Sequence, residues 1–113
     1  MDKTVNNVRV DKICIDGLVK SLIILSPGEK GNFDTIFKIL EDSELIWRDN
    51  YAPASSMVDW YVSERTERKE TAIDKIFEYF LQIAPDVYSD EKDLYGETVK
   101  PQIGNKIRTW FNI

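Results

Sequence analysis

The strongest constraint on the fold is the spacing of the apolar residues just before Pro85. They recur every three or four positions, as on one face of a helix, and a proline cannot continue that helix. The polar stretch upstream leaves the start open, at about Thr71 or as far back as Ser56. A helix that ends before Pro85 is therefore the clearest expectation, and its apolar stripe comprises Ala72, Ile73, Ile76, Phe77, Phe80 and Ile83.

Three other residues are possible start signals for helical segments. Asn32 is a suitable N-cap for a helix with Phe33, Ile36, Phe37 and Leu40 on one face. Ser43 could cap a short helical turn that runs through Trp47. Near the end of the chain, Pro101 suits a first helical turn, and the apolar stripe after it is Ile103, Ile107, Trp110 and Phe111.

Two segments fit either a helix or strands. Residues 8–25 favour a helix from about Arg9 to Leu25, but a hairpin that turns at Asp16-Gly17 also fits their β-branched composition. Residues 57–62 are similarly ambiguous. We expect a single domain over residues 1–113 with a mainly α fold, a compact bundle of four to five helices. The alternative is a small α+β domain with a short hairpin or sheet from residues 8–25 and 57–62.

The histidine and cysteine counts limit the chemistry. The 113 residues include no His and one Cys, which excludes hydrolases that use His and metal sites that use His or several Cys from this chain alone. Cys14 is expected to be a small core hydrophobe. We therefore predict that the protein is not an enzyme and uses no metal or cofactor.

The charge is unevenly distributed along the chain. The formal net charge is −5, yet residues 86–97 carry five acids against one lysine, and residues 98–113 carry three bases and no acid. Residues 86–97 read as a solvated acidic loop. The chain has no apolar run of membrane-spanning length and no signal-peptide core at its N-terminus, so we expect a cytoplasmic protein without membrane contact. The negative charge argues against nucleic acid as a partner.

The acidic loop does not fit two sites that need carboxylates. Asp86, Asp90 and Glu97 match positions one, five and twelve of a calcium loop, but Tyr88 and Glu91 occupy the positions that need an oxygen ligand and a glycine. Pro85-Asp86 and Asp90-Glu91-Lys92 match the letters of a magnesium-dependent nuclease motif, but the gap between them is too short to bring those side chains together. We expect neither site.

Aromatic side chains motivate the leading functional hypothesis. Tyr and Trp are enriched at binding hot spots, and this chain has three Trp and five Tyr. We expect a non-catalytic module for protein–protein interaction or regulation, which binds another protein, such as a basic one, or a second copy of itself. The interaction candidates are Trp47, Trp60, Tyr95, Trp110 and Phe111.

Two alternatives rest on charge. A small acidic inhibitor or immunity-type protein would block a basic effector or nucleic-acid-binding site through the acidic patch of Asp86, Asp90, Glu91, Asp93 and Glu97. A regulatory nucleic-acid-binding protein would use a basic C-terminal face. That face comprises Lys100, Lys106 and Arg108.

Overall fold

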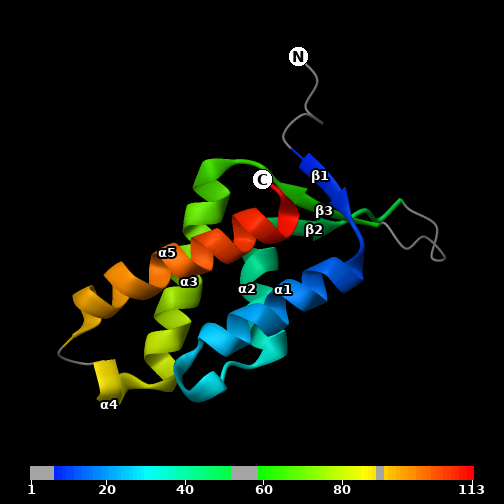
Figure 1. The fold of residues 1–113 in the computed structure, drawn as a ribbon. Helices are drawn as coiled ribbons and strands as arrows, with labels where there is room; N and C mark the ends of the chain where they lie inside the picture. The colour runs from blue at the N-terminus through cyan, green and yellow to red at the C-terminus, as the bar shows by residue number, and fades with distance from the viewer. Residues whose placement is uncertain (1–6, 52–58, 89–90) are drawn as a thin grey trace.

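Helices form most of the protein, with a small antiparallel sheet at one end (Figure 1). A computed structural model describes residues 7–51, 59–88 and 91–113. This arrangement confirms the mainly α expectation, and the sheet agrees with its α+β alternative. The helical elements are α1 (Lys12–Leu25), the 3-10 turn η2 (Pro27–Glu29), α2 (Phe33–Asp42), α3 (Thr66–Ile83), α4 (Pro85–Tyr88) and α5 (Lys92–Phe111). The strands are β1 (Asn7–Val10), β2 (Ile46–Arg48) and β3 (Trp60–Ser63).

The first ambiguous segment divides into a strand and a helix. Residues 7–10 form β1, and α1 follows with Asp11 as its N-cap. The expected helix start at Arg9 was therefore wrong, because Val8 and Val10 pair with β3 instead. The hairpin alternative was also wrong at Asp16-Gly17, which lies inside α1. The helical spacing from Ile15 to Leu22 gives α1 its buried face.

Strand β3 is the middle strand of the sheet, between β1 and β2, and both pairings are antiparallel. Val62 lies opposite Val8 and Ile46, and it is fully buried. The expected short helical turn through Trp47 was wrong, because the chain turns at Glu44, which has a left-handed φ of 58°, and continues as β2. Residues 57 and 58 lie outside the described residues, and the strand begins at Trp60.

Helix α3 starts between the two expected positions. It begins at Thr66, after a short connection from β3, so the start at Thr71 was wrong. Ser56, the other suggested start, lies outside the described residues, but β3 separates it from α3. The helix ends at Ile83 before Pro85, as the apolar spacing predicted.

Helix α5 is longer than the sequence suggested. It begins at Lys92, so the acidic segment is not wholly a loop, and Pro101 lies in the helix interior rather than its first turn. Two glycines of α5, Gly96 and Gly104, are buried against α3. A Cβ at Gly96 would lie 3.1 Å from Phe77 Cζ, and one at Gly104 would lie 3.2 Å from Ile73 Cδ1. Glycine allows α3 and α5 to approach closely, although it is a weak helix former.

The four longer helices share one core with the sheet. Its buried side chains form a single cluster, which α1, α2, α3 and α5 enclose together with the inner face of the sheet. In Figure 1, α5 crosses in front of α3, and α1 lies in front of α2. Helices α1 and α5 pack directly against each other. None of the helices in the described ranges has the length and apolar character needed to span a membrane.

Candidate interaction surface

Trp110 is held on the surface by two contacts with α1. Its indole Nε1 donates a hydrogen bond to the backbone carbonyl oxygen of Cys14, with an N–O distance of 2.6 Å. Its ring lies against Gly17, where a Cβ would come within 2.7 Å of Trp110 Cζ2. The ring therefore fits only because residue 17 has no side chain. Trp110 nevertheless remains 41% exposed, so its position is fixed while part of the ring faces solvent.

A groove begins beside this tryptophan and runs between α1 and α5. It has a volume of about 510 Å³ and is lined by Leu25, Gln102, Asn105, Lys106, Thr109 and Trp110. Two isoleucines on the solvent side of α1 extend the apolar surface, since Ile13 is 73% exposed and Ile24 is 64% exposed. We call the whole surface the α1–α5 face. It comprises Ile13, Gly17, Lys20, Ile24 and Leu25 of α1 and Gln102, Asn105, Lys106, Thr109 and Trp110 of α5.

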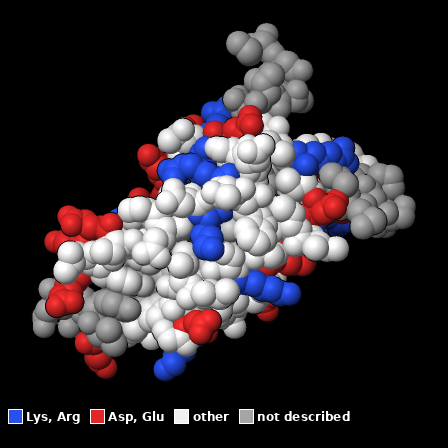
Figure 2. Space-filling view, viewed as in Figure 1, with Lys and Arg blue, Asp and Glu red and all other residues white. Residues whose placement is uncertain are grey.

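The charge on the α1–α5 face is positive. Lys20 and Lys106 are exposed, and among the described residues no acidic side chain forms an ion pair with either. Asp16, the acid of α1, pairs with Lys12 at 3.1 Å. Figure 2 views the molecule with α1 and α5 in front, and shows uncharged surface with separate blue groups, while red groups lie mainly toward the edges.

One polar group beneath this face has no partner. Ser21 is more than nine-tenths buried, and its hydroxyl makes no hydrogen bond within the described part of the chain. The residue lies four positions after Gly17 and four before Leu25, so all three share one side of α1. Buried hydroxyl groups are normally hydrogen-bonded. Ser21 is thus an unused donor in the line of residues that α1 turns toward α5.

Cys14 lies partly buried against the core at the Trp110 end of the face. Burial raises the pKa of its thiol, and the nearby charge of Asp11 raises it further, while a hydrogen bond with Trp110 acts in the opposite direction. The thiol is therefore poorly ionised near neutral pH. Cys14 was expected inside the core, but it packs at the edge of the core instead.

The other aromatic candidates have different surroundings. Trp60 and Phe111 belong to the core, at 6% and 4% exposed, and Trp60 packs edge-on against Phe37 with ring centroids 5.3 Å apart. Tyr95 is half-buried and packs against Phe77, with ring centroids 5.5 Å apart. These three side chains support the fold rather than offering free surface.

Trp47 belongs to a stack on the outer face of the sheet. Its ring stacks on that of Tyr61, with centroids 5.6 Å apart. Arg9 lies over Tyr61 at 5.5 Å, and Arg68 lies over Trp47 at 5.7 Å. Because β3 is the middle strand, Tyr61 lies between Arg9 and Trp47. Neighbours within the protein thus contact these rings, and beside Trp47 they leave a pocket of about 380 Å³ that Arg68 also lines.

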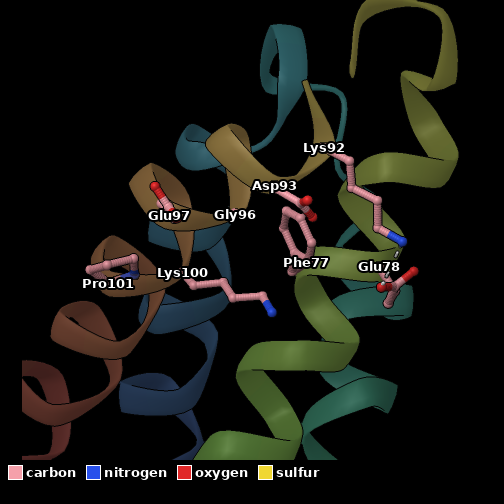
Figure 3. A pocket seen from close by; sticks show the side chains of 8 residues that line it. All are labelled: Phe77, Glu78, Lys92, Asp93, Gly96, Glu97, Lys100 and Pro101. Carbon is pink, nitrogen blue, oxygen red and sulfur yellow. Dashed lines mark ion pairs between the residues drawn. The ribbon is translucent and has the colours of Figure 1, made fainter. Parts of the chain in front are cut away.

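A second groove lies between α3 and α5 and has a volume of about 550 Å³ (Figure 3). Its lining carries two lysines among three acids, and both lysines form ion pairs. Lys92 pairs with Glu78 at 3.8 Å, and Lys100 pairs with Asp74 at 3.3 Å while lying 4.7 Å from the centre of the Phe77 ring. The lining residues are Phe77, Glu78, Lys92, Asp93, Gly96, Glu97, Lys100 and Pro101.

The described residues of the predicted acidic patch, and those of the predicted basic face, do not all lie together in the structure. Asp93 and Glu97 of the acidic patch share the α3–α5 groove with Lys92 and Lys100, while Asp86 and Glu91 are exposed elsewhere on the surface. Asp90 lies outside the described residues. On the predicted basic face, Lys100 turns toward α3 and Lys106 lines the α1–α5 groove. The guanidinium of Arg108 lies beside Gly104.

The sequence reasoning identified Trp110 and Lys106 but missed the α1 half of the face. Ile13, Gly17, Lys20 and Ile24 follow one another at helical spacing, on the side of α1 away from its buried stripe. The sequence did carry one signal of this surface. The helix already has a complete core face, so its two further isoleucines must point outward. The role of Gly17 had no sequence signal, because it depends on Trp110.

Neither a metal site in the described residues nor a similar known protein points to a function. Within residues 7–51, 59–88 and 91–113, no group of three or more Cys, Asp or Glu side chains is placed to hold a metal ion. Comparison with known protein families, curated proteins and solved structures gives no match to this chain.

Proposed function

We propose that this protein is a non-catalytic protein–protein interaction module and that the α1–α5 face is its binding surface. The observation that carries the proposal is the position of Trp110, which is fixed by Gly17 and by the Cys14 carbonyl while its ring stays partly exposed. A rigid aromatic side chain loses little conformational entropy when a partner covers it, and Trp is enriched among residues that dominate binding energy.

The surroundings of Trp110 support the same proposal. Ile13 and Ile24 expose most of their side chains on α1, and the groove adds Leu25 to this apolar surface. Single exposed hydrophobic residues are ordinary, but apolar residues grouped around a groove with a polar rim are typical of interaction sites. The polar rim here is formed by Gln102, Asn105, Lys106 and Thr109.

The two alternative functions have weaker support. An acidic inhibitor needs a concentrated negative surface, but Lys92 and Lys100 lie among the acids of the α3–α5 groove. A nucleic-acid-binding face needs several cations in one place, but Lys100 is paired on the α3 side while Lys106 lies on the α1 side. Neither arrangement favours these functions over protein binding.

A crosslinking experiment tests the proposed surface. Benzoylphenylalanine replaces Thr109 on the α1–α5 face or, as the control, Lys75 on the exposed side of α3, and each protein is irradiated in its source cells. The expected result is a discrete adduct from position 109 alone. Excess purified wild-type protein should suppress this adduct in a lysate, while the Trp110→Ala variant should not. Equal adducts from both positions, or none from position 109, would contradict the proposal.

A further inference from the structure

We infer that the occupant of the α1–α5 face is an amphipathic helix of another protein with acidic residues beside its apolar stripe. This inference rests on the proposed function and adds the chemistry of the partner to it. Three features carry it: the shape of the surface between α1 and α5, the unpaired positive charge on both helices, and the polar side chains that line the groove.

The shape fits a third helix. Gly17 lies against Trp110, and Leu25 lines the groove with Gln102, so α1 and α5 run antiparallel along their contact. Two packed helices leave a groove into which the side chains of a third helix can insert. The exposed apolar surface of α1 extends from Ile13 to Ile24. At 1.5 Å per residue this is about 16 Å, or three helical turns.

The charge of the surface calls for acidic groups on the partner. Lys20 lies between Ile13 and Ile24 on α1, and Lys106 lines the groove from α5. Neither lysine has an acidic partner in the described ranges, although the chain as a whole carries a net charge of −5. The face therefore presents positive charge although the chain as a whole is acidic. Carboxylates that flank the apolar stripe of a docked helix would meet one lysine on each side.

The polar side chains that line the groove fit a helix with polar residues beside its apolar stripe. Asn105 and Thr109 line the groove on α5 and can hydrogen-bond to side chains at the edge of an apolar stripe. Gln102 also lines the groove, but its side-chain amide already donates one hydrogen bond to the Thr98 carbonyl at 2.9 Å, which leaves its second N–H for a partner. Carboxylates accept hydrogen bonds from all of these groups.

Two other occupants fit less well. A second copy that docked by the same face would bring the lysines of both copies into one interface, with no acid on the face to compensate. A nucleic acid would find only these two lysines, while Ile13 and Ile24 offer nothing to a phosphate backbone. An acidic amphipathic helix uses both the apolar and the charged residues.

Designed peptides test this inference on the full chain. The probe is a capped peptide of about 14 residues, long enough for three helical turns, with Leu at helical spacing and Glu on both flanks. Matched peptides carry Gln or Lys in place of Glu. Binding is followed by the backbone amide signals of the isotope-labelled protein. We expect the Glu peptide to shift signals of the α1–α5 face and to bind at least about fivefold more tightly than the Gln peptide.

Charge reversal on the protein provides the control. Lys20→Glu and Lys106→Glu should each weaken the Glu peptide about fivefold or more, while Lys75→Glu, which makes the same change of net charge on α3, should leave its affinity within about twofold. The Lys peptide should bind Lys20→Glu and Lys106→Glu more tightly than it binds the wild type. A strong loss in Lys75→Glu would show that overall charge controls binding and would overturn the inference.

The remaining outcomes separate this inference from the proposed function. If the Gln, Glu and Lys peptides bind the face equally, the acidic partner is wrong but the interaction surface stands. Concentration-dependent shifts on this face without any peptide, or tighter binding of a single-stranded oligonucleotide, would replace the acidic helix by a second copy or by a nucleic acid. If no peptide perturbs the face at millimolar concentration, the inference fails, and the crosslink from position 109 decides separately whether the proposed function fails with it.

Discussion

The indole of Trp110 occupies the space that a side chain at Gly17 would fill. A Cβ on residue 17 would lie 2.7 Å from Trp110 Cζ2, which is closer than two carbon atoms can approach without displacement. The same indole donates a hydrogen bond to the Cys14 carbonyl, one helical turn earlier on α1. Gly17 and Trp110 therefore act as a pair, and each sets the effect of changing the other.

A double-mutant cycle measures this pairing. Gly17→Ala alone should destabilise the protein by about 1–2 kcal/mol, because overpacking outweighs the better helix propensity of alanine. In a Trp110→Ala background the clash is absent, and the same change should stabilise the protein by about 0.5–1 kcal/mol. Urea denaturation followed by circular dichroism gives all four stabilities. If Gly17→Ala changed stability in the same direction in both backgrounds, this account would be contradicted.

The sheet stack should contribute to stability rather than binding. Tyr61→Leu removes a ring that lies between Arg9 and Trp47, and we expect a loss of about 1–2 kcal/mol. Tyr51, which is 98% exposed, is the matched control, and Tyr51→Leu should change stability by less than about 0.5 kcal/mol. Thermal or urea unfolding of the two variants tests this difference. Equal effects would show that the stack adds nothing to stability.

Short-range signals predicted most of the helices. The apolar spacing before Pro85 predicted the end of α3, and Asn32 was predicted correctly as the N-cap of α2, since its side chain accepts a hydrogen bond from the Thr35 backbone N–H. Both features depend on residues that are neighbours in sequence. The choice between helix and strand at Val8 and Val10 instead depends on pairing with β3, some 50 residues away, which no local pattern records.

Tertiary packing likewise explains why the sequence did not predict the contacts of α5 or the α1 half of the candidate site. Gly96 and Gly104 appear in the sequence as helix breakers, but they let α3 approach closely. Trp110 was predicted as a candidate because of its residue type alone. Its hydrogen bond to Cys14 joins residues 96 positions apart, so its role as a fixed, exposed ring became evident only when α1 and α5 were placed together.

The cap at Asn32 gives a local test of helix α2. Asn32→Ala removes the side-chain acceptor for the Thr35 N–H and should reduce stability by about 1 kcal/mol. Asn32→Asp keeps an acceptor of the same size and should stay within about 0.5 kcal/mol of the wild type. The backbone N–H of Asn32, which donates to the Tyr79 hydroxyl at 2.8 Å, is retained in both variants. Urea denaturation distinguishes the two, and a loss of stability in Asn32→Asp equal to that in Asn32→Ala would rule out the capping role.

The raised pKa of Cys14 predicts how stability depends on alkaline pH. Burial and the charge of Asp11 hold the folded-state pKa of this thiol above its ordinary value, so around that value the folded protein binds more protons than the unfolded chain. Stability is therefore fully present below about pH 8.5, the pKa of an unfolded cysteine, and declines as the pH rises through the folded-state pKa.

Cys14→Ala isolates this effect from other groups that titrate in alkali. Urea denaturation from neutral pH to about pH 10, above the unfolded thiol pKa, should show a steeper loss of stability in the wild type than in Cys14→Ala. Reaction of the native thiol with a disulfide reagent should also be slower than that of the unfolded protein, because the reactive species is the thiolate. Identical pH slopes for the two proteins, together with fast labelling of the native thiol, would show that Cys14 ionises as an ordinary exposed cysteine.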